Sequence, residues 1–438
     1  MGITVAKFGG SSLADADQFR KVQEIIESDL ARRYIVPSAP GKRNNDDRKI
    51  TDLLYLCHTH VQQTVPFDDV FGIIQERYLR IIQDLGLPFD LEPELETVKK
   101  QIASGASADF TASRGEYLNG LIMAQLLGYD FIDPVEIIFF DERGNLDGEK
   151  TQKTIHKQLA GHERAVIPGF FGSDIHGAVK TFTRGGSDIT GALVSRGVHA
   201  DIYENWTDVS GLLMTDPSIV KNPKPIDTVT YRELRELAYM GAKVLHDEAI
   251  FPVREANIPV CIKNTNRPED PGTMIVQDAD PITHRGNITG IAGKKDFTVI
   301  VVEKALMNAE LGYGRRVLSV LEVNGISFEH MPSGIDTLSL VIADSELENK
   351  LDNVVREIRS SCRPDSVEVY PNMALIATVG RGMAYTPGIA SRLFNALSDR
   401  KINVRMIDQG SSEINIIVGV ENEDFEKAMH AIYEAFVD

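Results

Sequence analysis

Short apolar runs alternate with longer amphipathic stretches over roughly the first 280 residues. Runs of strand length and β-branched composition are followed by stretches with apolar residues three and four positions apart, which is the rhythm of repeated βαβ units. We therefore predict an open, mostly parallel α/β sheet sandwiched by helices, with ligands at the carboxyl ends of its strands. Strands are expected at 3–9, 34–39, 164–172, 199–208 and 258–264, and helices at 16–32, 51–63, 187–199, 231–242 and 246–257.

Two features interrupt or end this alternation. The segment from Asp68 to Ser107 reads as a mostly helical insertion, which we expect to form one wall of the ligand site. Between Arg267 and Arg285 the sequence becomes rich in Pro, Gly and Asp between two apolar blocks, as is typical of a domain boundary. The first predicted domain therefore covers residues 1–280.

Two similar smaller units are predicted beyond this boundary. The first has the order βαββαβ of a ferredoxin-like domain, and the second lacks its last strand. An unpaired sheet edge is a liability, and the run NITGIAG at 287–293 is the natural filler. We therefore predict one domain at 295–371, inserted into a second domain made of 287–293 plus 372–438. The expected strands are 287–293, 296–303, 326–333, 336–344, 366–371, 373–380, 403–409 and 413–420, and the expected helices are 312–325, 347–361, 386–400 and 423–436.

Length and charge narrow the class of protein. A chain of 438 residues predicts two or three domains, and the excess of acidic over basic residues, 64 against 46, disfavours nucleic acid and anionic membranes as partners. An apolar run of roughly 18 residues that could cross a bilayer is not found. The N-terminus does not resemble a secretory signal, and the three cysteines form no CxxC pair, so we expect a cytoplasmic protein without disulfides or a zinc site.

Two glycine-rich segments carry the candidate chemistry. Lys7 precedes Gly9, Gly10 and Ser11 between a predicted strand and a helix, where glycines let the backbone approach phosphate groups. A glycine-containing turn with a serine cap is the alternative. The second segment, TRGGSD at 183–188, again enters a helix; its arginine can grip a carboxylate and its aspartate can orient a lysine or a phosphate-bound magnesium ion. A charged helix cap is the alternative here.

These two segments occur together with WTDVSG at 206–211, TDP at 215–217 and GAKVLH at 241–246. The set, in this order, resembles the aspartokinase branch of the amino-acid kinase family, and the two C-terminal units look like the paired ACT domains of that family. The resemblance covers essentially the full length. It implies that ATP, with Mg²⁺, phosphorylates the side-chain carboxylate of L-aspartate to give 4-phospho-L-aspartate. This reaction is the first step of the pathway to lysine, threonine and methionine. The resemblance also implies feedback inhibition by lysine, threonine or both, and assembly as a homodimer or dimer of dimers.

The resemblance also implies a role for each matching position. Lys7 would neutralise charge on the transferred phosphoryl group, and Asp188 would orient the Lys7 side chain. Arg184 would bind the α-carboxylate of aspartate, and Glu116 would bind its amino group. No protein metal site is indicated by a clear motif. The remaining implied contacts are Gly9, Gly10 and Ser11 with phosphate oxygens, Thr207, Asp208 and Lys243 with the nucleotide, and Thr51 with the substrate.

Some positions depart from the family pattern. Tyr117 stands where an arginine is expected, and Leu213 and Ser218 replace a tyrosine and an arginine near the nucleotide. The charged segment at 41–50 is longer than the loop expected before Thr51 and is a candidate for a mobile lid.

Two loops of the first small unit resemble the effector-binding loops of ACT domains. They contain Met307 and Gly312, and Ser333 and Asp336; for the second loop, a simple turn built by proline and glycine is the alternative.

Other functions stay open at this stage. The chain could be a kinase for glutamate, N-acetylglutamate or a nucleoside monophosphate, or an amino-acid sensor without activity. Glu116 together with Arg184 favours a free α-amino acid, and Lys7, Asp188 and the glycine loops would be unnecessary in a pure sensor. A fused homoserine dehydrogenase is excluded because the sequence ends directly after the second small unit.

Overall fold

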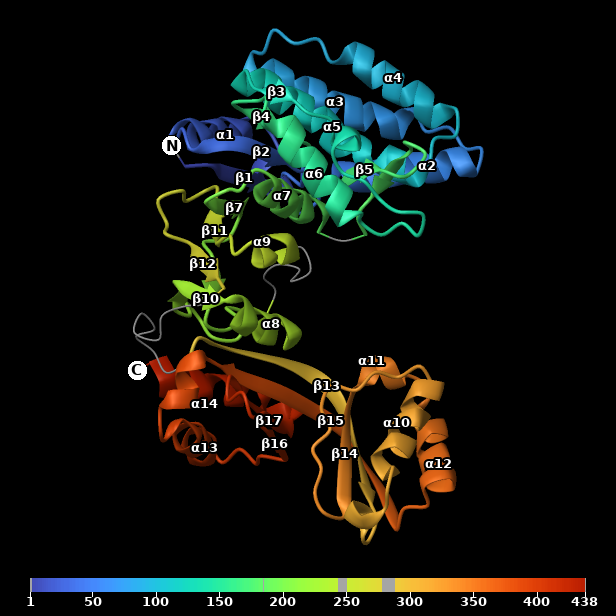
Figure 1. Ribbon diagram of the computed structural model, residues 1–438, viewed down its shortest axis with the longest axis vertical. Helices are drawn as coiled ribbons and strands as arrows, with labels where there is room; N and C mark the ends of the chain where they lie inside the picture. Colours follow the sequence, from blue (N-terminus) through green and yellow to red (C-terminus); the bar gives the residue numbers. More distant parts are fainter. Residues whose placement is uncertain (1, 184, 243–249, 278–287, 438) are drawn as a thin grey trace. The chain divides into compact units, whose positions relative to one another are not determined.

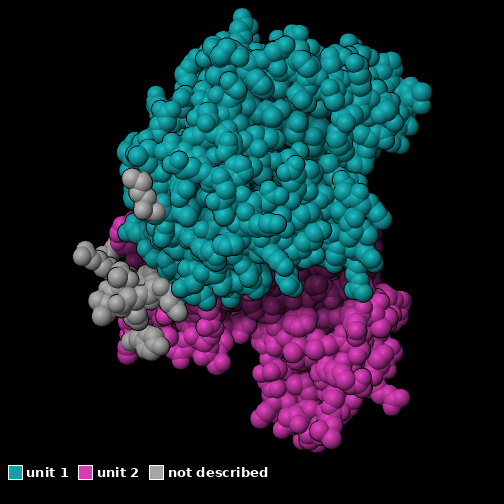
Figure 2. Space-filling view, turned by 45° about the horizontal axis from the view of Figure 1, so that its top comes forward, with its two compact units in different colours: residues 1–212, 225–231, 244–279 teal, residues 213–224, 232–243, 280–438 magenta. Residues whose placement is uncertain are grey.

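The computed structural model describes residues 2–183, 185–242, 250–277 and 288–437, and it divides into two compact units that are coloured separately in Figure 2. Unit 1 consists of residues 1–212, 225–231 and 244–279, and unit 2 of residues 213–224, 232–243 and 280–438. Arg184, Lys243 and Asn287, which carry predictions from the sequence, lie outside the described residues. Among the described helices, none is long and apolar enough to cross a membrane.

Unit 1 is built on an eight-stranded sheet with the order β10-β12-β11-β7-β1-β2-β4-β3 (Figure 1). Neighbouring strands run parallel except for the pair β11 and β12, so the predicted open, mostly parallel α/β sheet is confirmed. Its strands are β1 (Thr4–Phe8), β2 (Arg32–Pro37), β3 (Asp130–Phe131), β4 (Ala165–Val166), β7 (Ile202–Thr207), β10 (Thr228–Thr230), β11 (Val260–Asn264) and β12 (Thr273–Val276).

Helices lie against this sheet and form most of the core. Alternation along β1 sends Ala6 and Phe8 into the large apolar cluster formed with α1 to α5, while Lys7 points to the opposite side, where α7 lies against β1, β2 and β7. The side containing Lys7 therefore carries the polar chemistry. The helices of unit 1 are α1 (Ala16–Glu27), α2 (Ile50–Gln62), α3 (Asp68–Leu85), α4 (Glu92–Ala103), α5 (Ala108–Leu127), α6 (Gly148–Leu159), α7 (Gly186–Gly197) and α9 (Phe251–Glu255). The helix α8 (Tyr231–Tyr239) belongs to unit 2 except for its first residue.

Two local expectations for this part of the chain need correction, and a third is described only in part. The strand expected at 164–172 is two short strands, because Pro168 and Gly169 separate β4 from β5 (Phe171–Ser173), which forms a hairpin with β6 (Val179–Thr181). The glycine loop after β1 enters a single 3₁₀ turn (Gly10–Leu13) before α1 begins, not a helix directly. Of the helix expected at 246–257, the described part is α9 alone. The pair β8 (Leu212–Leu213) and β9 (Pro225–Ile226) completes the short strands.

Unit 2 contains one five-stranded antiparallel sheet with the order β14-β13-β15-β17-β16. Its two 14-residue strands, β13 (Gly290–Glu303) and β15 (Ser366–Val379), run through both predicted small units, as the long arrows of Figure 1 show. The remaining elements are β14 (Thr337–Ala343), β16 (Met406–Asp408), β17 (Asn415–Glu421), α10 (Tyr313–Val323), α11 (Asp344–Leu347), α12 (Leu351–Cys362), α13 (Ile389–Asp399) and α14 (Phe425–Val437).

The continuous strands differ from the four separate strands expected from the sequence. The polar residues between the apolar runs looked like strand ends, but the chain passes them with an irregular register between Lys294 and Phe297, where Asp296 has φ 69°. Residues 290–294 pair with 375–379, the neighbours that an inserted first unit requires, and residues 297–303 pair with both β14 and β15. Two apolar clusters, one around Ile300 and one around Ile376, fill the two halves of the sheet.

Two further expectations were wrong. The segment 326–333 makes only isolated bridges at His330 and Ser333, and Pro332, which has no N–H, interrupts the ladder between them. The helix expected at 347–361 is broken by Glu348, which has φ 34°, so α11 and α12 are separate.

Candidate active site

A buried ion pair joins the first strand to the second glycine-rich segment. Lys7 Nζ lies 2.6 Å from Asp188 Oδ1, and both side chains are largely buried. Lys7 is at the carboxyl end of β1 and Asp188 is in the first turn of α7, so the sheet and the helix bring together two residues that are far apart in the sequence. The structure thus joins the two residues that sequence analysis selected as catalytic.

Asn205 is a third member of this cluster, which sequence analysis missed. Its Nδ2 donates a hydrogen bond of 2.8 Å to Asp188 Oδ1, and the residue is almost fully buried. Lys7 and Asn205 are direct partners in the parallel ladder of β1 and β7, so their side chains leave the sheet on the same side. A polar residue between buried positions of a central strand was the signal that could have found it.

The phosphate-loop candidates lie next to Lys7. The Gly9 N–H donates to the Trp206 carbonyl at 3.0 Å, so this group is already used within the protein and the predicted phosphate contacts narrow to the N–H groups of Gly10 and Ser11. The Ser12 hydroxyl is hydrogen-bonded to the Thr265 hydroxyl at 2.7 Å and fastens the following turn to the segment after β11.

Backbone approaches backbone closely at Gly10. Its carbonyl accepts a hydrogen bond of 2.8 Å from the N–H of Gly41, and a Cβ atom on Gly41 would come within 2.5 Å of the Gly10 carbonyl carbon. Only glycine fits at position 41, because distances below 3.0 Å to a backbone atom require the chain to move. The segment after β2 is thus held directly against the glycine loop that follows β1.

The second glycine-rich segment is shaped by Gly185 and Gly186. Gly185 caps α7 in the left-handed region, with φ 58°, and a Cβ atom on Gly186 would lie 2.6 Å from the Phe170 ring. Phe170 itself has φ 83°, a conformation that bulky residues avoid, and such strain concentrates at functional sites. Arg184, the residue predicted to bind the substrate carboxylate, is outside the described residues.

Glu116 lies on the inner side of α5 and is almost completely buried. Burial raises the pKa of its carboxyl group to about 8, although a backbone hydrogen bond from Ala39 opposes the rise. Its Oε2 atom has no hydrogen-bond partner among the described residues, which is costly for a buried acid and suits a cationic ligand. Thr51, in the first turn of α2, is half-buried.

The neighbours of Glu116 show what the departure at Tyr117 does. Arg114 is buried against the rings of Phe110, Tyr117 and Phe171, with its guanidinium carbon 4.5, 4.4 and 5.3 Å from their centroids. Burial lowers the pKa of Arg114, and the ring faces partly compensate for lost water. Tyr117 therefore stacks on a cation one helical turn away, in addition to an edge contact with Phe131.

The candidate nucleotide side begins where β7 ends. The Thr207 carbonyl accepts a hydrogen bond of 2.8 Å from the Thr265 N–H, and its hydroxyl lies 3.2 Å from a carboxylate oxygen of the exposed Asp208. Lys243, also predicted here, is outside the described residues. Of the other departures, Leu213 is exposed, and the Ser218 hydroxyl is hydrogen-bonded to Asp216 at 2.6 Å; both belong to unit 2.

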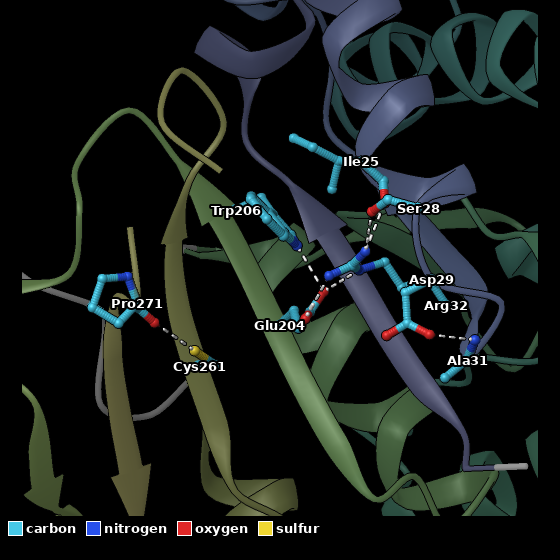
Figure 3. Close-up of polar contacts among 9 residues, drawn as sticks. All are labelled: Ile25, Ser28, Asp29, Ala31, Arg32, Glu204, Trp206, Cys261 and Pro271. Carbon is cyan, nitrogen blue, oxygen red and sulfur yellow. Dashed lines mark hydrogen bonds and ion pairs between the residues drawn. The ribbon is translucent and has the colours of Figure 1, made fainter. Parts of the chain in front are cut away.

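A buried charge network supports β7 behind this region (Figure 3). Arg32 on β2 contacts both carboxylate oxygens of Glu204, at 2.7 and 3.1 Å, and the Trp206 indole N–H donates to the same carboxylate at 2.9 Å. Trp206 is 1% exposed and its ring is stacked on Phe8, so it is a core residue and holds Thr207 in place only through the backbone.

In unit 2 the two predicted effector loops meet. The Asp336 side chain accepts a hydrogen bond of 2.8 Å from the Leu306 N–H, and its carbonyl accepts one of 2.8 Å from Lys304. Met307 follows directly in a short 3₁₀ turn, and Gly312 caps α10 with φ 76°. Ser333 forms an isolated bridge with Leu338. Asp336 therefore ties the loop of Met307 to the loop of Ser333.

The chain is similar to known proteins over its full length. Residues 2–264 match the amino acid kinase family and residues 376–436 match an ACT domain. Aspartokinase 3 of Bacillus subtilis (strain 168) is 37% identical over 447 residues, covering 99% of this chain and 98% of the relative. A crystal structure of Clostridium acetobutylicum aspartate kinase is 59% identical and covers all of both chains with a TM-score of 0.91.

Two crystal structures of E. coli aspartokinase III also cover all of both chains, with 25% sequence identity. One is a complex with aspartate and ADP and the other a complex with lysine and aspartate, and their TM-scores are 0.73 and 0.74.

The fold and the family match over residues 2–264 place the molecule in the class of amino acid kinases. Within that class, the chain belongs to the aspartokinase family. Its activity is accordingly the ATP-dependent phosphorylation of aspartate, a transfer to a carboxyl group, under allosteric control by amino acids. Neither another amino-acid kinase nor an inactive sensor is favoured.

Proposed function

We propose that Lys7 and Asp188 form the phosphoryl-transfer centre, with Gly10 and Ser11 holding the nucleotide phosphates. The observation that carries this assignment is the 2.6 Å ion pair beside the glycine loop, fixed by the hydrogen bond from Asn205. A cation held in place before the reaction stabilises charge on the transferred group without reorganising during the step. Gly9 supports the loop through its bond to Trp206.

The acceptor site consists of Thr51, Glu116 and Arg184. The buried, unpartnered oxygen of Glu116 supports the role of ammonium partner, because an ammonium ion would satisfy it and stabilise the charged carboxylate. The contribution of Arg184 to the α-carboxylate is proposed from its motif alone. Together the two charges would set both the position and the direction of aspartate, leaving its side-chain carboxylate toward Lys7.

The chemical step requires little from the protein beyond position and charge. One oxygen of the aspartate side-chain carboxylate attacks the γ-phosphorus of ATP, and the bond to the bridging oxygen breaks with release of ADP. This carboxylate is already deprotonated, so no general base has to remove a proton. Lys7 counters the negative charge that meets at the transferred phosphoryl group, and Asp188 keeps the Lys7 side chain in place.

The nucleotide is proposed to contact Thr207, Asp208 and Lys243 with its adenosine part. Mg²⁺ fits the available donors as an ion carried by the phosphates, because it prefers one or two carboxylates together with phosphate oxygens and water. Asp188 is the carboxylate in the right place, beside the phosphate loop. Bound there, the ion would neutralise phosphate charge.

Regulation is proposed to reside in residues 287–438. We divide them into one ACT unit at 295–371 and a second made of 287–293 plus 372–438, which the pairing of 290–294 with 375–379 supports. A free amino acid, lysine or threonine, would bind at the loops that contain Met307, Gly312, Ser333 and Asp336; the lysine complex of E. coli aspartokinase III supports lysine. A homodimer or dimer of dimers and a cytoplasmic location stay predictions.

The test is a coupled assay of ADP release with Mg-ATP and L-aspartate, L-glutamate or N-acetylglutamate, repeated with lysine and with threonine. We expect turnover with L-aspartate and none with L-glutamate or N-acetylglutamate. Lysine or threonine should inhibit this turnover, and Lys7→Ala should abolish it. Full activity of Lys7→Ala would refute the assigned centre, and turnover with glutamate would refute the acceptor assignment.

A further inference from the structure

Arg77 is a buried cation outside the site assigned so far. It lies in the middle of α3 and is 3% exposed, whereas arginine is almost never buried without partners. Its guanidinium group faces the loop at 41–49, which precedes Thr51. One nitrogen donates to the Gly41 carbonyl at 3.1 Å and the other to Asp47 Oδ2 at 2.6 Å. A single side chain thus holds both ends of the loop.

The loop closes around the Asp47 carboxylate. The backbone N–H and the side chain of Arg43 donate to it at 3.0 and 2.9 Å, in addition to the bond from Arg77. Burial raises the pKa of Asp47, but the hydrogen bonds from Arg43 and the charge of Arg77 outweigh burial and hold this pKa well below its ordinary value. Asp47 is therefore charged at neutral pH and pairs with both arginines. The long insertion, expected from sequence to be a mobile lid, is tied to α3 at Gly41 and at Asp47.

The loop in turn supports residues 39–41, which lie between the proposed phosphate-binding loop and Glu116 of the proposed acceptor site. Gly41 donates to the Gly10 carbonyl of the phosphate loop at 2.8 Å. Two residues earlier, the Ala39 backbone is hydrogen-bonded to Glu116, and a Cβ atom on Gly115 would be only 2.9 Å from the Ala39 side chain. Residues 39–41 are therefore wedged between the helix of Glu116 and the phosphate loop.

We propose that Arg77 is a positioning residue for phosphoryl transfer, which sets the spacing between the donor and acceptor sites by clamping the loop at 41–49. The clamp acts through Gly41 on Gly10 and through the same backbone on Glu116. This inference rests on the proposed roles of Gly10 and Glu116. Small errors in the placement of two reactants cost large factors in rate, which makes a clamp of this kind consequential.

Arg77 could alternatively be a structural ion pair that only keeps α3 in the fold. The two roles predict different kinetic constants for the folded molecules of a variant. A structural role lowers the amount or thermal stability of folded enzyme and leaves kcat and KM per folded molecule unchanged. A positioning role changes both kinetic constants and frees the loop.

The test compares Arg77→Met and Arg77→Lys with Arg80→Gln, a control on the same helix whose side chain is 66% exposed and lies 3.6 Å from Asp84. The readouts are kcat, KM for aspartate and for ATP, thermal midpoint, and trypsin cleavage after Lys42, Arg43, Arg48 and Lys49, located by mass spectrometry. All four residues lie within the loop, and all four are exposed to solvent.

For Arg77→Met we expect kcat/KM to fall at least about tenfold for both substrates and loop cleavage to speed up by a similar factor. Arg77→Lys should recover part of both effects, and Arg80→Gln should match the parent enzyme. If Arg77→Met does not fold, Asp47→Asn removes the other half of the clamp and should show the same changes.

Parent kinetics in a folded Arg77→Met or Asp47→Asn variant would overturn the proposal, as would lost activity with unchanged loop cleavage. Lys7→Ala separates this failure from failure of the proposed function. If Lys7→Ala is inactive and the Arg77 and Asp47 variants behave like the parent enzyme, only the proposed role of Arg77 is wrong. If Lys7→Ala is active, the proposed phosphoryl-transfer centre is wrong as well.

Discussion

Asn205 donates its side-chain N–H to Oδ1 of Asp188, the same oxygen that is paired with Lys7. The carboxylate is therefore held by two donors from neighbouring strands, β1 and β7, and cannot turn without losing one of them. This geometry leads to the first prediction.

Replacing Asn205 by Ala should lower kcat by about tenfold or more with a smaller change in the KM for aspartate, because the Lys7–Asp188 pair loses its anchor while the acceptor site stays intact. Steady-state kinetics with Asn205→Asp beside it supply the comparison. The aspartate variant places a second negative charge against Asp188 and should be the more damaged of the two. Unchanged kcat in both variants would show that the anchor is dispensable.

The raised pKa of Glu116 predicts a pH dependence of aspartate binding. Burial raises this pKa to about 8, so below pH 8 most free enzyme carries a protonated, neutral carboxyl group at this position. The substrate ammonium pairs with the charged form. The KM for aspartate should therefore fall as pH rises toward 8, by up to about tenfold per unit at the acidic end, and then level off.

The measurement is the KM for aspartate between about pH 6 and 9, with Glu116→Gln as the comparison. The glutamine variant should bind aspartate weakly at every pH and should lose the slope. A slope that survives in Glu116→Gln would assign the titration to another group.

The Arg32–Glu204 pair predicts an effect on stability without a direct effect on chemistry. Glu204→Ala leaves the buried Arg32 guanidinium without its anion and should lower the free energy of unfolding of unit 1 by about 3–5 kcal/mol. Asp17→Ala, which breaks the exposed pair with Arg20, should cost less than about 1 kcal/mol. Urea unfolding followed by Trp206 fluorescence measures both, because Trp206 is the single tryptophan of the sequence and is bonded to Glu204. Equal effects of the two variants would contradict the difference in burial.

The two neighbouring glycines of the phosphate loop should tolerate a methyl group differently. A Cβ atom on Gly9 would lie 3.5 Å from the Trp206 carbonyl oxygen, an ordinary contact, whereas one on Gly10 would lie 2.9 Å from the Ala39 carbonyl oxygen. We expect Gly9→Ala to fold normally and Gly10→Ala to distort the loop and weaken ATP binding by at least about tenfold. Isothermal titration with a non-hydrolysable ATP analogue tests this. Equal affinities of the two variants would argue against the close approach at Gly10.

In unit 2, Asp336 should matter for regulation. Asp336→Ala removes the acceptor that holds Leu306 beside Met307, and it should raise the effector concentration for half-inhibition by about tenfold while kcat without effector stays unchanged. Asp365→Ala is a matched control, since Asp365 accepts a hydrogen bond from the adjacent Ala305 N–H at 2.7 Å. Inhibition curves with lysine and with threonine decide the matter. Equal losses in both variants would reduce the role of Asp336 to general support of the loop.

Much of this architecture was predictable because local patterns report it. Strand and helix periodicity placed the parallel sheet, and Lys7 and Asp188 were found since each belongs to a glycine motif at a strand–helix junction. Arg77 was not found, and the one signal for Asn205, a polar residue within a central strand, does not show which side chains it meets across the fold. Long-range partners are set by ladder register and helix packing, and single-sequence patterns carry little of either.

The misread strands of unit 2 have a similar cause. The polar residues at 294–295 predict a break between two strands, since a bulge and a turn have the same composition when read along one strand. Only the partner strand distinguishes them: β15 continues alongside, so the chain does not turn.

The long strands β13 and β15 limit how this protein can be taken apart. Each strand runs through both of the predicted small units, and residues 290–294 and 297–303 of β13 both pair with β15. Removing residues 372–438 would leave residues 290–294 without their β15 partners and would create an unpaired edge strand that can aggregate. The modules are therefore inseparable by simple truncation, and variants meant to silence one of them are better made as point substitutions in its loops.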